Sequence, residues 1–148
     1  MNVGLVAENL DDGLVIAAMN ELVDSGECNV TAFINDFRPY PVSPAFAILP
    51  QKEVFIFDGS LLAIDFPSAK LILNRFRKGR NFYYLNSLVW RKVEHLSYNS
   101  IAQVFLNDDL ELVAKNRDDA SIFRSVWGRQ ATFIGEQFES VVRTIGKG

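Results

Sequence analysis

Short apolar segments alternate with longer amphipathic stretches along this chain. A continuous apolar segment is typical of a strand buried on both faces, and an amphipathic stretch is typical of a helix that covers a sheet. Strand–helix units repeated in this way give parallel strands, and their right-handed crossovers place helices on both faces of the sheet. The sequence therefore predicts an α/β fold, a three-layer αβα sandwich around a mainly parallel sheet of about six strands.

The first strand and the first helix have the clearest signals. Residues 3–7 form a continuous apolar segment. Apolar residues then recur at spacings of three and four over 12–25, and Gly26 follows, as expected at the end of a helix. Further strands are expected at 30–34 and 46–49, as one or two strands within 54–65 around an Asp58-Gly59 turn, and at 81–85, 110–114 and 132–134. Further helices are expected from Pro67 to 78–80, as one or two helices over 90–106, and at 118–127 and 138–145.

Length and composition indicate one domain. The chain has 148 residues, of which 49% are hydrophobic, enough to enclose one core at the commonest domain size. No linker, low-complexity tract or internal repeat divides it. We therefore expect a single Rossmann-like domain over residues 1–148.

Charge and hydropathy argue against two classes of partner. The formal net charge of −3 gives no electrostatic reason to bind a polyanion, and the basic residues at 75–80 suit the end of a helix. No apolar run is long enough to span a membrane, and the first residues lack the pattern of a signal peptide. We expect a cytoplasmic protein that binds neither nucleic acid nor membrane.

Cysteine and histidine are too few for the common metal and redox sites. Cys28 is the only cysteine and His95 the only histidine, so neither an intrachain disulfide nor a Cys/His zinc site is expected. On its expected helix, His95 suits a surface or half-buried position better than the role of a catalytic base. The Walker, Gly-x-Ser-x-Gly, Cys-x-x-Cys and His-Glu-x-x-His patterns are absent. We therefore assign no catalytic residue, no metal site and no cofactor from these motifs.

The turn after the first strand is acidic. A dinucleotide-binding domain would have Gly-x-Gly-x-x-Gly there, but this chain has Glu8, Asn9, Leu10, Asp11 and Asp12. Carboxylates at a helix N-terminus complement the helix dipole and repel a pyrophosphate. Ordinary dinucleotide binding is therefore disfavoured, and capping of the helix is the simpler interpretation.

Polar residues also lie beside several other expected strands. Asp36 follows the second strand, and Asp58 and Asp65 flank the fourth. Open α/β sheets bind ligands at the carboxyl ends of their strands, although Asp and Asn also favour turns for local hydrogen-bonding reasons. We predict a ligand face made of Glu8, Asn9, Asp11, Asp36, Asp58 and Asn86.

Aromatic residues cluster around the strand at 81–85. Tyr83 and Tyr84 lie in it, and Trp90 follows. Their rings suit either a sugar-stacking platform or the core beside the sheet, and core packing is the commoner use of such rings.

The order of elements resembles the N-terminal half of GT-B type glycosyltransferases, in particular the short, divergent members found in tailed phages. The resemblance rests on 2–6, on 57–65 leading into a helix at Ser68, on 82–85 followed by Trp90, and on 98–115. In that family this half binds the acceptor, and a second Rossmann domain binds the sugar nucleotide. The resemblance implies a domain that binds a sugar or sugar nucleotide, needs a donor-binding partner domain, and is at most half of an enzyme.

Two alternatives from other classes stay open. The chain is also compatible with an oligomeric structural or interaction protein, such as a dimer, that buries an edge strand or an aromatic helix with Trp90 or Trp127. The third hypothesis is an enzyme that holds Mg²⁺ or Mn²⁺ on strand-end aspartates, with Asp108 and Asp109 among them.

Overall fold

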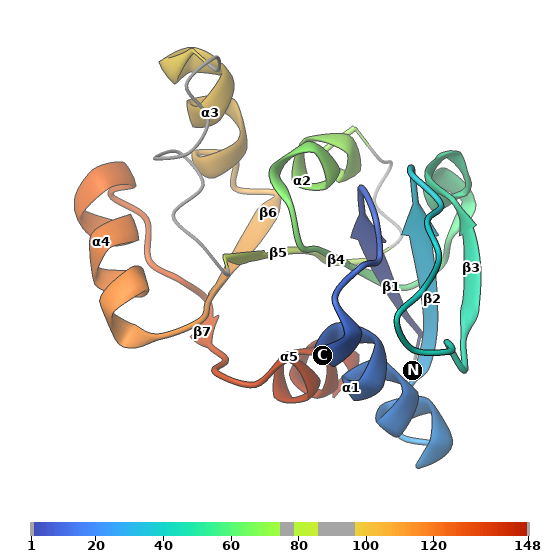
Figure 1. Cartoon of the computed structure of the whole chain (residues 1–148). Coiled ribbons are helices and arrows are strands. Elements are labelled where there is room, and N and C mark those ends of the chain that lie inside the picture. The colour runs from blue at the N-terminus through green and yellow to red at the C-terminus, as the bar shows by residue number, and fades with distance from the viewer. Residues whose placement is uncertain (1, 75–78, 86–96, 148) are drawn as a thin grey trace.

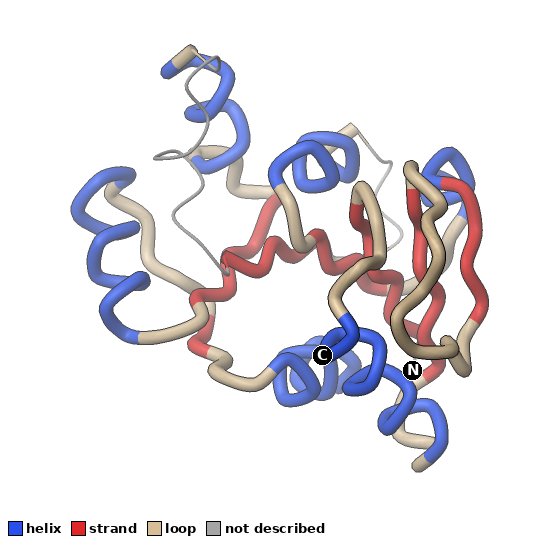
Figure 2. Tube along the Cα trace, viewed as in Figure 1, coloured by secondary structure: helices blue, strands red, loops and turns tan. Residues whose placement is uncertain are grey.

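Parallel strand pairing organises the chain. The computed structural model describes residues 2–74, 79–85 and 97–147, and within these ranges seven strands form one sheet in which each neighbouring pair is parallel (Figure 1, Figure 2). This confirms the predicted sandwich, with slightly more strands than expected. The spatial order is β3-β2-β1-β4-β5-β6-β7. The strands are β1 (Asn2–Ala7), β2 (Asn29–Ile34), β3 (Ala47–Pro50), β4 (Ser60–Ala63), β5 (Asn81–Leu85), β6 (Leu110–Ala114) and β7 (Phe133–Ile134).

Helices cover both faces of this sheet, as Figure 1 shows. Two helices, α1 and α5, pack side by side on one face, and their apolar residues share a cluster with Leu5 of β1. The other helices belong to a second cluster, which includes Val6 of β1. Successive residues of β1 thus point to opposite faces, as the pleat of a strand requires. The helices are α1 (Gly13–Asp24), the 3₁₀ helix η1 (Gln51–Ile56), α2 (Phe66–Ile72), α3 (Tyr98–Phe105), α4 (Arg117–Trp127) and α5 (Phe138–Lys147).

Side-chain caps fix where these helices begin. Asp12 Oδ1 accepts a hydrogen bond from Leu14 N at 2.9 Å at the start of α1, and Asn116 Oδ1 accepts one from Asp119 N at 2.8 Å at the start of α4. Each cap satisfies a backbone N–H that has no partner inside the helix. The helix α4 ends at Trp127, and its C-cap is Gly128, whose φ of 68° is a left-handed conformation that glycine adopts at low cost.

Of the one or two strands expected within 54–65 the structure has one, because residues 54–56 belong to η1 and Phe57 is its C-cap. Val54 is buried, whereas Phe55 and Ile56 are 43% and 72% exposed, so this apolar run has one inward side chain per turn. A short continuous apolar run does not distinguish a strand from a helical turn. The sheet therefore takes one strand from this region, β4.

Two expected helices differ from the structure in length. The helix expected from Pro67 to 78–80 begins at Phe66 and ends at Ile72, with Leu73 as its C-cap. Of the helix or helices expected over 90–106, the described part is α3, which Ser97 caps. Trp90 and His95 lie outside the described residues.

Tyr83 and Tyr84 pack in the core, on opposite faces of β5. Tyr83 is 2% exposed and its ring lies 5.8 Å from that of Phe105. Tyr84 is 6% exposed, lies 5.8 Å from the Phe138 ring, and donates a hydrogen bond to Gly135 O at 3.0 Å. Burial raises the pKa of both phenols, and the charge of Asp65 adds to the rise for Tyr83.

Substitution of Gly4 tests the packing of β1. A Cβ at Gly4 would lie 2.6 Å from Leu61 Cδ2 and 3.0 Å from the rings of Phe33 and Phe57. We expect Gly4→Ala to lower the free energy of unfolding by about 1–3 kcal/mol, because this part of the core is full. Gly13→Ala is the control, since its Cβ would meet no atom closer than 3.5 Å. Urea denaturation that gives both variants the same stability would contradict this packing.

The buried tyrosines make stability depend on alkaline pH. A phenol whose pKa is raised in the folded state stabilises the fold fully below the pKa of the unfolded chain, about 10, and loses this contribution as the pH rises toward the folded pKa. Each such tyrosine costs about 1.4 kcal/mol per pH unit in that window. We expect Tyr83→Phe to show a shallower loss of unfolding free energy above pH 10 than the parent chain. Equal slopes in urea denaturation across that window would contradict the burial of this phenol.

Candidate functional site

The order in which successive strands are added to the sheet reverses between β1 and β4. From β1 it builds outward through β2 to β3, and then returns to place β4 on the other side of β1. The segments that follow β1 and β4 therefore leave toward opposite faces, into α1 and α2 (Figure 1). Open α/β sheets bind ligands in the crevice at such a point.

A cleft occupies this point. Its volume is about 710 Å³, within the range of roughly 300–1,000 Å³ that is usual for small-molecule sites. The turn after β1 and the first turns of α1 form part of its lining, together with Asp65 after β4. Lys115 after β6 and the segment 136–139, which leads from β7 into α5, also line it.

Hydrogen bonds from three other segments hold the turn after β1. Glu8 N donates to Asp65 Oδ2 at 2.7 Å, and Asp36 N donates to Glu8 O at 2.7 Å. Gln51 Nε2 donates to Ala7 O at 2.8 Å. The ends of β2 and β4 and the start of η1 thus fix the backbone at the mouth of the cleft.

Asp65, in the lining of the cleft, binds two backbone segments through one carboxylate. Besides the bond from Glu8 N, its Oδ1 accepts a hydrogen bond from Ser68 N at 2.9 Å, which caps α2. The same side chain therefore ties the β1 turn to the first turn of α2. It is half-buried, so water does not fully replace either bond.

The loop after β2 reaches the rim of the cleft. Arg38 Nε lies 2.7 Å from Asp36 Oδ2, and Arg38 Nη1 lies 3.9 Å from Asp11 Oδ2. All three side chains are about half exposed, so these ion pairs contribute little to stability. They bring a single cation near the acidic turn.

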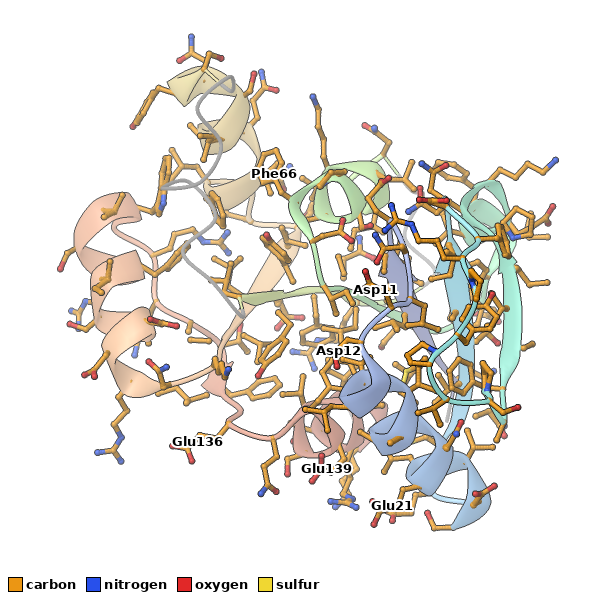
Figure 3. All side chains as sticks on the ribbon, in the orientation of Figure 1. Asp11, Asp12, Glu21, Phe66, Glu136 and Glu139 are labelled. Atoms are coloured by element: carbon orange, nitrogen blue, oxygen red, sulfur yellow. The ribbon has the colours of Figure 1, made fainter. Side chains whose placement is uncertain are left out.

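The lining of the cleft is strongly acidic. Figure 3 labels carboxylates from both of its sides: Asp11, Asp12 and Glu21 come from the turn before α1 and from α1, and Glu136 and Glu139 come from the segment that enters α5. Apolar and aromatic side chains, among them Tyr84 and Phe138, complete the lining. Within the described lining the carboxylates are Glu8, Asp11, Asp12, Glu21, Asp65, Glu136 and Glu139, and the one cationic side chain is Lys115.

The structure brings together only part of the predicted ligand face. Glu8, Asn9 and Asp11 line the cleft. Asp36 lies at the same edge of the sheet and contacts the turn through its backbone N–H, but it is not part of the lining. Asp58 does not follow a strand, because the residues before it form η1. It precedes β4 and therefore lies at the opposite edge of the sheet. Asn86 lies outside the described residues.

Sequence reasoning missed several residues of the cleft. Tyr84 was interpreted only as an aromatic of the core or of a stacking platform, and it lines the cleft while its ring stays buried. The sequence analysis does not name Lys115, Glu136 or Glu139 as site residues. Lys115 directly follows β6, and Glu136 lies two residues after β7. Its position directly after β6 is the signal that could have identified Lys115.

The carboxylates do not converge as metal ligands would. Asp108, Asp109 and Glu111 lie with Arg80 around a smaller cavity of about 370 Å³ at the opposite edge of the sheet, where Glu111 forms a two-pronged ion pair with Arg80. Within residues 2–74, 79–85 and 97–147, no three His, Cys, Asp or Glu side chains are grouped so that they could hold a metal ion. The same ranges contain no helix long and apolar enough to cross a bilayer.

Comparisons with known proteins give no further guide to this site. A scan against protein-family models, a search of curated proteins and a search of solved structures found no match to the chain. The geometry and chemistry of the cleft are therefore the basis for a functional assignment.

Removal of the Asp65 carboxylate tests the construction of the cleft. Asp65→Ala leaves Glu8 N and Ser68 N without their acceptor, and we expect a loss of about 1–3 kcal/mol in unfolding free energy. The control is Asp12→Ala, which removes one exposed cap and should cost about 1 kcal/mol. Amide hydrogen exchange gives the local readout: Glu8 N–H should exchange faster in Asp65→Ala and unchanged in Asp12→Ala. Unchanged exchange in both variants would show that Asp65 does not hold the turn.

Proposed function

We propose that this chain is a glycosyltransferase-like binding domain that holds a small, hydroxyl-rich ligand of the sugar class in the cleft between the carboxyl ends of β1 and β4. In this proposal it acts as the acceptor-side half of a GT-B type arrangement and depends on a donor-binding partner domain for transfer. The observation that carries the proposal is the acidic, hydrogen-bonded turn at the position where a nucleotide-binding relative of this fold needs glycines.

The chemistry of the lining favours hydroxyl groups over phosphates. Carboxylate and backbone oxygens accept hydrogen bonds, and sugar hydroxyls donate them. A phosphate placed about 4 Å from a carboxylate meets a repulsion of about 1–4 kcal/mol for each pair of charges. Several carboxylates around the cleft add to this repulsion. A sugar acceptor therefore suits the cleft better than a sugar nucleotide does.

The remaining lining suits the apolar side of a sugar ring. Leu10, Val15 and Ile64 contribute aliphatic surface, and Tyr84 and Phe138 contribute aromatic rings. Ligand sites of this size usually combine such apolar walls with a few placed polar groups. The cleft has both components.

A protein-interaction role is the second candidate, and one observation favours it. β3 is an edge strand, and near it the side chains of Leu49, Phe55 and Ile56 are 39%, 43% and 72% exposed. An exposed strand edge with apolar neighbours is a common site of association. Light scattering over a range of protein concentrations separates this candidate, because it requires the mass to rise with concentration.

Sugar binding can be tested by NMR titration. The titration uses glucose, galactose, mannose and maltose. We expect at least one of these sugars to shift the amide signals of Glu8, Asn9 and Asp11 more than those of Asp58 and Asp108, which lie at the opposite edge. The substitution Ala18→Phe should abolish the shifts, because Ala18 lines the cleft and a ring there would fill it. Ser121→Phe on α4, which is exposed and outside the lining, is the matched control. The absence of shifts with every sugar would contradict the proposed function.

A further inference from the structure

We propose that the ligand of this cleft carries a protonated amine, so that the site selects amino sugars over neutral ones. This inference rests on the proposed function and names its ligand class more closely. It follows from how charge is distributed over the chain and from what each carboxylate of the cleft already does.

Negative charge is concentrated in the cleft. Seven carboxylates and one ammonium give the described lining a formal charge of −6, whereas the whole chain has −3. The rest of the chain is therefore net positive. Concave sites with walls of low polarity focus such a field toward their interior and attract a ligand of opposite sign. A protonated amine carries the opposite charge and is attracted by this field, whereas a neutral sugar is not.

Some of these carboxylates have structural duties. Asp65 accepts hydrogen bonds from two backbone N–H groups, Asp12 caps α1, and Glu8 accepts a hydrogen bond from Asn35 Nδ2 at 2.9 Å. Asp11 lies near Arg38. The presence of these four acids in the lining is explained by the fold itself.

The other three acids make no direct bond of this kind. Within the described part of the chain, the carboxylates of Glu21, Glu136 and Glu139 form neither a hydrogen bond nor an ion pair with the protein. They come from two elements, α1 and the segment into α5, that face the same cleft (Figure 3). The Arg143 guanidinium on α5 is near enough for the charges of Glu21 and Glu139 to raise its pKa, but its direct ion pair is with Glu27. A ligand amine would therefore be the first direct partner of these three carboxylates.

The arrangement fits an organic cation better than an inorganic one. A divalent cation needs several oxygen ligands at about 2.0–2.6 Å from one point. The described residues form no group of three that could do so. An ammonium on a sugar ring needs only one or two nearby carboxylates, and it also interacts favourably with the rings of Tyr84 and Phe138 in the same lining.

Two sugars that differ in one charge test the inference. Glucosamine, at a pH where its amine is protonated, is compared with N-acetylglucosamine, in which the amine is an uncharged amide. We expect glucosamine to bind in the cleft at least roughly tenfold more tightly in NMR titrations, which corresponds to about 1.4 kcal/mol. The preference should shrink as sodium chloride is added, because salt screens charges at partly exposed sites.

Charge-neutral variants locate the preference. The double variant Glu136→Gln, Glu139→Gln should reduce the ratio of the two affinities severalfold while leaving the binding of N-acetylglucosamine nearly unchanged. The control is Glu53→Gln, Asp24→Asn, which makes the same change in net charge outside the lining. A preference that falls equally in both variants would indicate a general effect of net charge and would overturn the assignment.

The remaining outcomes separate this inference from the function on which it rests. If neutral sugars shift the cleft amides and glucosamine binds no more tightly, the amine is not recognised and the proposed sugar site stands. If glucosamine shifts only amides at the opposite edge, near Arg80 and Asp108, the inference is also wrong. If no sugar, charged or neutral, shifts the cleft amides, both proposals fail.

Discussion

The backbone of the central strand β1 must be paired along both edges, because it is buried where water cannot replace a lost hydrogen bond. β2 and β4 supply these pairs in parallel register over most of its length. β1 thus pairs with β2, the next strand in the sequence, and with β4, a later strand. The chain must cross over twice to bring these strands to the two edges of β1, and the crossovers cover opposite faces of the sheet. The cleft lies on one of these faces, between the turn after β1 with α1 and the segment that enters α5.

The same requirement continues past the end of the strand. At the last residue of the strand, Ala7 O accepts a hydrogen bond from Gln51; just past it, Glu8 N donates to Asp65 and Glu8 O accepts from Asp36 N. These three bonds come from segments that are distant in sequence but are brought to one edge by the parallel sheet. The turn is therefore ordered by the fold before any ligand arrives, which reduces the entropy that binding would otherwise cost.

The sequence reveals this arrangement only in part. The continuous apolar character of β1, the three-and-four spacing of α1 and the positions of Asp12 and Gly26 were sufficient to predict the first strand and helix, because each is a local signal. The edge to which Asp58 belongs was not predictable in this way, since it depends on whether the apolar run before it is a strand or a 3₁₀ turn. Glu136 follows β7, a strand that the sequence does predict at 132–134, but it reaches the cleft because the chain then runs into α5 beside α1. Its place in the cleft follows from tertiary packing alone.

The acidic turn changes what this fold can bind. In nucleotide-binding members of this architecture, the free N–H groups at the start of the first helix hold a phosphate. Here Asp12 occupies that role within the chain, because its carboxylate accepts the hydrogen bond from Leu14 N that an anion would otherwise receive. The anion site is therefore filled by the protein's own carboxylate, and the neighbouring acids add to the charge around it. A cleft in which the chain itself supplies the anion is complementary to a ligand that donates hydrogen bonds or carries positive charge.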